Sequence, residues 1–285
     1  MVLEAWRLRP LVEQALREDL FFGDPTTEAL VPEGLKGRGV CRSKEPLVVC
    51  GLPVAREVFG VVDPELEVDF RVREGEQVEA YTTLFEVRGR IRSILQGERV
   101  ALNFLQHLSG IATLTRRFVE AVRGLPVRIV DTRKTTPGLR YLEKYAVRVG
   151  GGHNHRLGLS EGVLIKDNHI RACGGIKEAV KRAREKLPHV FRLEVEVSSL
   201  EELEEALSAG AEVILLDNFD PPRVREAVAR ARSLRPQVLL EVSGGVTLEN
   251  VRAFAETGVD LISVGRLTHS APAVDIHLKI TETFN

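Results

Sequence analysis

Cysteine is scarce in this sequence, and its spacing excludes the usual cysteine-based architectures. The 285 residues contain three cysteines, Cys41, Cys50 and Cys173, and no two of them form a Cys-x-x-Cys pair. An odd and widely spaced set predicts neither a disulfide framework nor a zinc site. We therefore expect reduced thiols and a cytoplasmic protein.

Neither sign of charge is in excess, and long apolar runs are missing. The chain has 40 basic and 41 acidic side chains, for a formal net charge of -1. A general nucleic-acid-binding protein needs a basic excess or stripe, so we expect no nucleic-acid partner. No window approaches the roughly 20 apolar residues that span a bilayer, so we expect no membrane partner.

The composition is that of an ordinary globular protein, and the two halves of the chain differ in their strand and helix patterns. Hydrophobic residues make up 44% of the chain and charged residues 28%, which is typical of a folded protein. Up to about residue 110, short strand-like runs alternate with turns, and residues 8–20 and 93–108 show helical spacing. This pattern predicts a first α/β domain over residues 1–110, with an antiparallel or mixed sheet.

The second part repeats a strand-then-helix pattern. Apolar runs at 127–130, 162–165, 191–197, 213–216, 238–242 and 261–264 are mostly separated by helical patterns. Such a repeat predicts parallel strands with crossover helices. About six units fall short of the eight in a closed barrel, so we expect an α/β fold with an incomplete barrel at 111–270. An open doubly wound sheet is the alternative, but no dinucleotide-type glycine fingerprint follows a strand. For 271–285 we expect a helix that packs on the first domain.

Polar residues and glycines gather where these strands end, and their charges are sorted along the chain. The early units supply cations, the middle units carboxylates, and the last units glycine-rich turns: Arg133, Lys134, Arg156 and Lys166; Glu196 and Asp217; Ser243, Gly244, Gly245, Gly265 and Arg266. Strand ends are where barrels place functional residues. Arginine pairs with carboxylates, and late barrel loops often bind phosphate. Middle carboxylates suit ribose hydroxyls, Mg²⁺ or developing positive charge. The pattern therefore predicts a ligand that is anionic at one end, phosphorylated at the other and sugar-like between.

Each of these features also has a simpler explanation. Glu196 could form a structural ion pair with a nearby arginine, and a Gly-Gly pair is usually only a turn. His153 and His155 could be solvated, since no third ligand at metal-site spacing stands out. Lys166 could form a Schiff base, as in aldolase-type barrels. Their occurrence at successive strand ends favours an enzyme.

Longer blocks support a specific resemblance. They are GERVALNFL at 97–105, DTRKTTPG at 131–138, GGHNHRLGL at 151–159, IKDNH at 165–169, EVEV at 194–197, LDN at 216–218 and SGG at 243–245. In these blocks the sequence resembles the quinolinate phosphoribosyltransferase family, also called carboxylating nicotinate-nucleotide pyrophosphorylase. Arg266 is a departure, because the family often has alanine there.

The resemblance implies a fold, a reaction and an assembly. The fold is an N-terminal α/β sandwich followed by an incomplete α/β barrel, and the assembly is a homodimer or is built from dimers. The reaction joins quinolinate to phosphoribosyl pyrophosphate with Mg²⁺. It yields nicotinate mononucleotide, pyrophosphate and CO₂, for NAD synthesis.

The resemblance also implies a role for each matching residue. Lys134, Glu196 and Asp217 are expected to be catalytic, and Glu196 and Asp217 to hold Mg²⁺ directly or through water. The wider substrate-binding set adds Thr132, Arg133, His155, Arg156, Lys166, Ser243, Gly244, Gly245, Val264, Gly265 and Arg266. Arg99 is expected to reach quinolinate in the partner subunit's site.

Three other functions stay open on sequence alone. A ModD-like paralogue associated with molybdenum uptake shares the fold and many motifs. An aldolase-type barrel would use Lys166 as its Schiff-base lysine. A non-catalytic module would bind a sugar phosphate without turnover.

Overall fold

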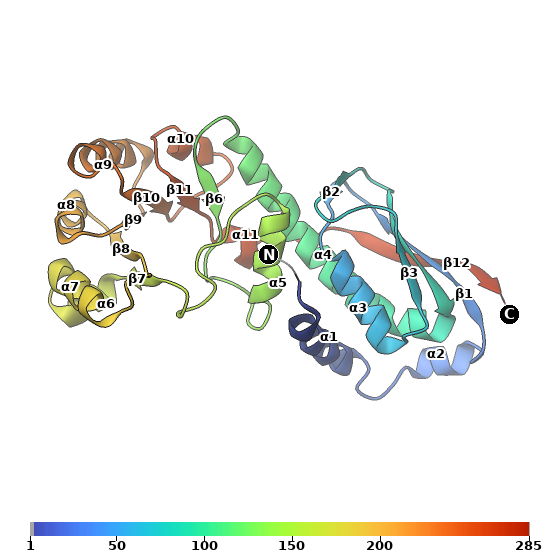
Figure 1. Cartoon of the computed structure of the whole chain (residues 1–285). Helices are drawn as coiled ribbons and strands as arrows, with labels where there is room; N and C mark the ends of the chain where they lie inside the picture. Colours follow the sequence, from blue (N-terminus) through green and yellow to red (C-terminus); the bar gives the residue numbers. More distant parts are fainter. Residues whose placement is uncertain (1–2, 285) are drawn as a thin grey trace. The chain divides into compact units, whose positions relative to one another are not determined.

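A computed structural model describes residues 3–284, which divide into two compact units (Figure 1). The first unit combines three segments: the described residues up to Arg116, Thr136–Gly151, and those from Ser270 onward. The second unit combines Arg117–Thr135 with Gly152–His269. The segment 136–151 therefore belongs to the first unit, although it lies within the stretch expected to form the barrel.

The first unit contains a four-stranded antiparallel sheet in the order β12-β1-β5-β3. Its strands are β1 (Lys36–Ser43), β3 (Glu67–Phe70), β5 (Thr83–Arg90) and β12 (Ile276–Phe284). A short antiparallel pair joins β2 (Leu47–Val48) to β4 (Gln77–Val78). The antiparallel sheet expected for the first domain is thus present.

The helix expected at 271–285 is wrong, because the described part of this segment forms β12. Ile276 and Leu278 are buried, whereas Lys279 is exposed, and burial of every second residue has the period of a strand. β12 pairs along the whole of β1, from Lys36 opposite Phe284 to Ser43 opposite Ile276. Pairing supplies the backbone hydrogen bonds that a helix would otherwise have made internally.

Helices α1 (Ala5–Asp19), α2 (Pro25–Leu30), α3 (Leu52–Val62) and α5 (Arg140–Val149) complete the first unit, and α4 (Ile91–Ala121) begins there and ends in the second. In the core, Phe59 of α3 packs edge-on against Phe85 of β5, with ring centroids 6.0 Å apart. The carboxylate of Glu74 caps α3 by accepting from the backbone N–H groups of Gly51 and Leu52.

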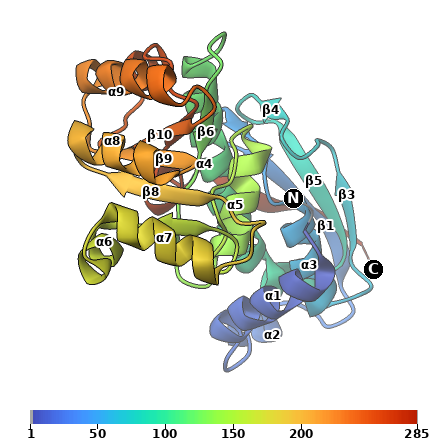
Figure 2. The same ribbon diagram turned by 60° about the vertical axis from the view of Figure 1, so that its left-hand side comes forward.

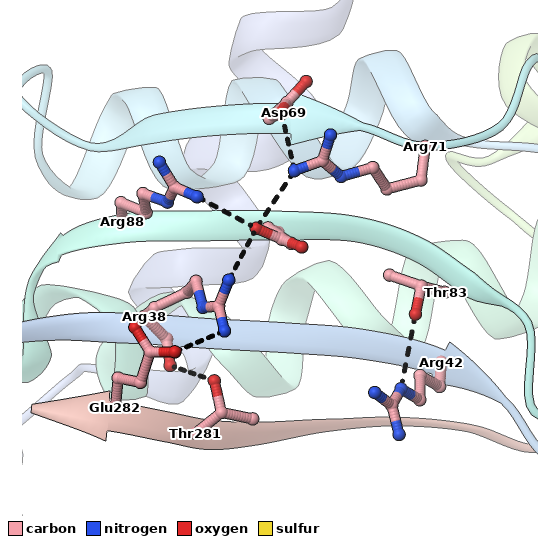
Figure 3. A network of polar contacts seen from close by, with 9 residues as sticks. Arg38, Arg42, Asp69, Arg71, Thr83, Arg88, Thr281 and Glu282 are labelled. Atoms are coloured by element: carbon pink, nitrogen blue, oxygen red, sulfur yellow. Dashed lines mark hydrogen bonds and ion pairs between the residues drawn. The ribbon is translucent and has the colours of Figure 1, made fainter.

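A network of ion pairs links neighbouring strands of this sheet (Figure 3). Oε2 of Glu86 lies 3.4 Å from Arg38 Nη1, 3.1 Å from Arg71 Nη2 and 3.3 Å from Arg88 Nη2. Arg38 also pairs with Glu282 of β12. The hydrogen bond from Arg71, together with the nearby guanidinium charges, holds the pKa of Glu86 below its usual range. Cross-strand pairs of this kind stabilise the sheet.

The second unit contains six parallel strands in the order β6-β11-β10-β9-β8-β7. They are β6 (Arg128–Val130), β7 (Val163–Ile165), β8 (Leu193–Val197), β9 (Val213–Asp217), β10 (Leu239–Ser243) and β11 (Leu261–Ser263). The sheet is not closed, which confirms the incomplete barrel. The middle strands are buried on both faces, and β9 has the continuous apolar composition of such a strand, whereas β8 and β10 also contain glutamates.

Helices follow strands β7 to β11, in line with the helical patterns that separate most of the apolar runs. They are α6 (Asp167–Cys173), α7 (Ile176–Lys186), α8 (Leu200–Ala209), α9 (Pro221–Leu234), α10 (Val251–Ala255) and α11 (Arg266–His269). Figure 2 shows α7, α8 and α9 lying along one side of β8, β9 and β10. Across residues 3–284, every helix is too short or too polar to cross a membrane.

Candidate active site

The second unit has a cavity of about 700 Å³ at the carboxyl ends of its parallel strands. Parallel strands point the same way, so the residues that follow them meet at one edge of the sheet. The cavity brings together these residues that the sequence singled out: Thr132, Arg133, Lys134, His155, Arg156, Lys166, Glu196, Asp217, Ser243, Gly244, Gly245, Val264, Gly265 and Arg266. The residues that follow the strands thus meet in one cavity, and His155 and Arg156 reach it from the loop before β7.

Arg99 is the candidate that lies elsewhere. It is exposed on α4, within the first unit, and is not among the residues that line this cavity. Within its own chain it is a helix-surface arginine.

Lys166 and Glu196 form a direct ion pair inside the cavity. Nζ of Lys166 lies 2.5 Å from Oε2 of Glu196, which extends from the adjacent strand β8. Glu196 thus pairs with a lysine and not with an arginine.

Arg133 and Arg156 place two positive charges close together. Burial, and then the charge of Arg133, lower the pKa of the Arg156 guanidinium. Arg156 is fixed by donating from Nη1 to the carbonyl oxygen of Gly162 at 2.9 Å. Two partly desolvated cations beside each other are stabilised by a bound anion, and a guanidinium suits a carboxylate.

The loop that carries His155 is held by a buried aspartate. Asp131 has no exposed surface, and its carboxylate accepts from the His155 backbone N–H at 2.9 Å and from Asn154 Nδ2 at 2.5 Å. The loop also extends the edge of β6, because the N–H of His153 donates to the carbonyl of Ile129. Asp131 is the first residue of the DTRKTTPG block, and its carboxylate holds the loop that carries His155.

His155 faces two buried glutamates that the site prediction omitted. Its Nε2 lies 3.1 Å from Oε2 of Glu194 and 3.8 Å from Oε1 of Glu241. The three ligating atoms lie within 4.8 Å of one another, close enough to suggest a metal site. Nδ1 of His155, however, accepts the backbone N–H of Arg156 at 2.8 Å. This contact assigns the ring proton to Nε2, and a metal would need the lone pair of that nitrogen.

Glycines shape another wall of the cavity. Gly244 and Gly245 have φ angles of +97° and +64°, which favour glycine. A Cβ at Gly244 would overlap the side chain of Asn218, and one at Gly265 would lie 3.3 Å from Cδ of Lys134. Neither position has room for a side chain, because both glycines pack closely against neighbouring side chains at the cavity.

Asn218 connects this wall to the carboxylates. It is a non-glycine residue with φ of +56°. Its Nδ2 donates to Oδ2 of Asp217 at 2.8 Å, and its backbone N–H donates to the carbonyl of Ser243 at 2.8 Å. Asparagine is among the non-glycine residues that most often adopt this left-handed backbone, so the residue type fits its place beside Asp217.

Glu196 and Asp217 offer the donor set that Mg²⁺ prefers. They lie at the ends of the neighbouring strands β8 and β9, and both line the cavity. Magnesium is usually held by one or two carboxylates together with substrate phosphates. The two residues therefore fit the magnesium ion that the resemblance implies.

These features define an α/β-barrel domain with a cation-rich, carboxylate-bearing site at its strand ends. The family models identify it further. The C-terminal domain model of quinolinate phosphoribosyl transferase matches residues 111–279, and the N-terminal domain model matches residues 24–109. The chain belongs to the quinolinate phosphoribosyltransferase family.

Curated relatives and solved structures agree with this assignment. A Mycobacterium leprae protein named nicotinate-nucleotide pyrophosphorylase (carboxylating) is 47% identical, over 95% of this chain and 96% of its own. A Synechocystis protein with the same name, qualified as probable, is 46% identical over 95% and 92%. The structure of the Francisella tularensis nicotinate-nucleotide pyrophosphorylase superposes with a TM-score of 0.93 at 40% identity, covering 98% of both chains.

Proposed function

We propose that this enzyme transfers the phosphoribosyl group of phosphoribosyl pyrophosphate to quinolinate. The products are nicotinate mononucleotide, pyrophosphate and CO₂, and the reaction serves NAD biosynthesis. Family membership over nearly the whole chain supports this proposal. The observation that carries it is a cavity in which cations, carboxylates and glycine turns follow one another around the sheet.

The cationic wall is suited to the two carboxylates of quinolinate. Arg133 and Arg156 are close enough for their charges to interact, and Lys166 lines the same cavity. Binding of a dianion would relieve the repulsion between the arginines and would compete with Glu196 for the Lys166 ammonium group. The substrate would thereby release the Glu196 carboxylate for a role toward the sugar.

The carboxylates are suited to the sugar. The pyridine nitrogen attacks the anomeric carbon while the bond to pyrophosphate breaks, and positive charge develops on the ribose. Glu196 and Asp217 are suited to stabilise that charge because both carboxylates line the cavity. Lys134 lies beside Gly265 and offers a cation to the phosphate-bearing end.

Glu196 and Asp217 would also hold Mg²⁺, directly or through water. When bound, the ion supplies positive charge that neutralises the pyrophosphate leaving group. Asn218 keeps one oxygen of Asp217 oriented for this role.

The proposed assembly is a homodimer in which Arg99 reaches the quinolinate pocket of the partner subunit. Its exposure on α4 leaves it available for a partner. We also propose a cytoplasmic location, in keeping with three cysteines that are all free thiols.

The deciding experiment is incubation of the purified protein with quinolinate, phosphoribosyl pyrophosphate and Mg²⁺, with CO₂ and nicotinate mononucleotide measured. We expect both products, and neither when quinolinate is omitted. A ModD-like paralogue would not turn over quinolinate. Borohydride trapping with a carbonyl substrate should leave Lys166 unmodified, whereas an aldolase-type enzyme would be trapped.

A further inference from the structure

Two glutamates are buried in the interior of the barrel with unsatisfied acceptor atoms. Glu241 is 2% exposed and Glu194 is 7% exposed. In each of them Oε1 has no hydrogen-bond partner among the described residues. Burial of two carboxylates with so few donors is costly unless a proton neutralises one of them.

Both glutamates lie two residues before a cavity-lining residue of the same strand. Successive side chains of a strand alternate between faces, so residues two apart share a face. Glu241 therefore shares the face of Ser243 on β10, and Glu194 shares the face of Glu196 on β8. Of this buried pair, Glu241 lines the 700 Å³ cavity, as does His155.

The groups around Glu241 favour its protonated form. Burial raises the pKa of Glu241 to about 7, and the neighbouring charges of Glu194 and Asp131 also raise it. His155 and a hydrogen bond from Ser263 act in the opposite direction. Below about pH 7, Glu241 therefore carries a proton at the wall of the cavity.

We propose that Glu241 is the general acid that protonates the ring carbon from which CO₂ departs. The inference rests on the proposed function, because that reaction exchanges a carboxylate for a hydrogen on the pyridine ring. The carbon–carboxylate bond breaks, and its electron pair stays on the ring carbon beside the quaternary nitrogen. The O–H bond of Glu241 then breaks, its proton forms the new C–H bond, and solvent later reprotonates the Glu241 carboxylate.

The charges in the cavity favour Glu241 over its neighbours for this role. The guanidinium groups of Arg133 and Arg156 do not release protons, because arginine stays protonated in proteins. Lys166 is an ion-pair partner, of Glu196 in the free enzyme and of a quinolinate carboxylate in the complex proposed above. A neutral acid on the cavity wall also avoids the repulsion that a carboxylate would exert on a dianionic substrate.

The test uses Glu241→Gln, a variant that keeps the side-chain shape and removes the acidic proton. It measures phosphoribosyl transfer and decarboxylation separately. Pyrophosphate release and nicotinate mononucleotide formation are followed in single turnovers. We expect pyrophosphate release within a factor of about three of the wild type. Mononucleotide formation should slow by at least about a hundredfold, the lower end for general acid catalysis. Mass spectrometry should detect the undecarboxylated mononucleotide.

Ser263→Ala provides a second variant that keeps the acid. The Ser263 side chain lowers the pKa of Glu241, so its removal should raise that pKa and move the decline of activity with rising pH to higher pH. Wild-type rates of mononucleotide formation in Glu241→Gln, or equal slowing of both steps, would overturn the proposal. So would an unshifted profile in a folded Ser263→Ala protein. A wild type without quinolinate-dependent product would instead overturn the proposed function.

Discussion

Asn218 donates a hydrogen bond from Nδ2 to Oδ2 of Asp217 at 2.8 Å while its own backbone occupies the left-handed region at φ +56°. The same residue donates its backbone N–H to Ser243. One residue therefore orients a carboxylate of the site and joins it to the glycine turn.

Replacement of Asn218 should lower turnover more than stability. Asn218→Gly keeps the backbone conformation and removes the amide, so only the hydrogen bond to Asp217 is lost. A hydrogen bond to a charged group contributes about 1.5–3 kcal/mol, and we expect kcat to fall roughly 10- to 100-fold. Asn218→Ala should also lower the melting temperature, because alanine is strained at positive φ. Unchanged kcat in the glycine variant would show that Asp217 does not need this partner.

Quinolinate should bind far more tightly than nicotinate. The cavity offers more cations than one carboxylate can pair with, and a cation that the ligand covers without pairing it costs roughly 2–5 kcal/mol. The monoacid should therefore bind tens to thousands of times more weakly. Isothermal titration of both acids measures this ratio, and equal affinities would contradict the assignment of the cationic wall.

Glu196→Gln and Asp217→Asn should reduce kcat more than they weaken quinolinate binding. A contact made mainly in the transition state affects turnover and leaves ground-state affinity largely intact. Glu196→Gln also removes the ion pair with Lys166, so its quinolinate affinity should equal or exceed that of the wild type. Kinetics and calorimetry on both variants decide the matter. Full turnover with weaker quinolinate binding would exclude a role toward the sugar.

Arg99 provides a test of shared sites. Arg99→Ala and Lys166→Ala should each be nearly inactive as homodimers. After the two are unfolded and refolded together in equal amounts, random pairing makes about half of the dimers hybrids, and one site of each hybrid is intact. About a quarter of all sites should regain activity in a two-fold dimer. Confirmed hybrids without activity above separately refolded controls would place Arg99 outside the partner's site.

Glu241 should lower the free energy of unfolding of the ligand-free enzyme as the pH rises. The folded pKa of about 7 lies above the value of about 4.3 in an unfolded chain, so the folded state binds more protons between these values. The contribution of Glu241 to the free energy of unfolding is therefore most favourable below about pH 4.3. It becomes less favourable as the pH rises from there to about 7. Glu241→Gln should therefore stabilise the protein by on the order of 1–3 kcal/mol at pH 8 and by little at about pH 4.5. Urea unfolding at both pH values measures this difference, and equal effects would exclude the raised pKa.

Much of the fold could be predicted because buried parallel strands have a distinctive composition. The runs ending at Asp217 and Ser243 are rich in Val, Ile and Leu and have polar ends, and those ends form part of the cavity. Strand β12 could not be identified in the same way. Its burial is confined to its first residues, and the rest of the strand is largely exposed, so composition alone does not distinguish it from a helix.

The interior of the site was harder to predict than its rim. Glu194 is visible in the sequence inside an apolar run, but its proximity to His155 depends on strand register and loop path. Glu241 lies between apolar neighbours in the same way, and the groups that set its pKa come from several other parts of the chain. A sequence shows that a carboxylate lies within an apolar run, whereas only the fold shows that it is buried and which charges surround it.

The pairing of β12 with β1 has a consequence for synthesis of the chain. β1 is translated early, but its edge partner comes from residues 276–284, after the entire second unit. On the ribosome, the second unit can form while one edge of β1 is still open. An open edge is a site for wrong pairing between chains, and charged side chains protect against it. Lys36, Arg38 and Arg42 lie on β1, so the growing chain carries positive charges along that edge until its last strand arrives.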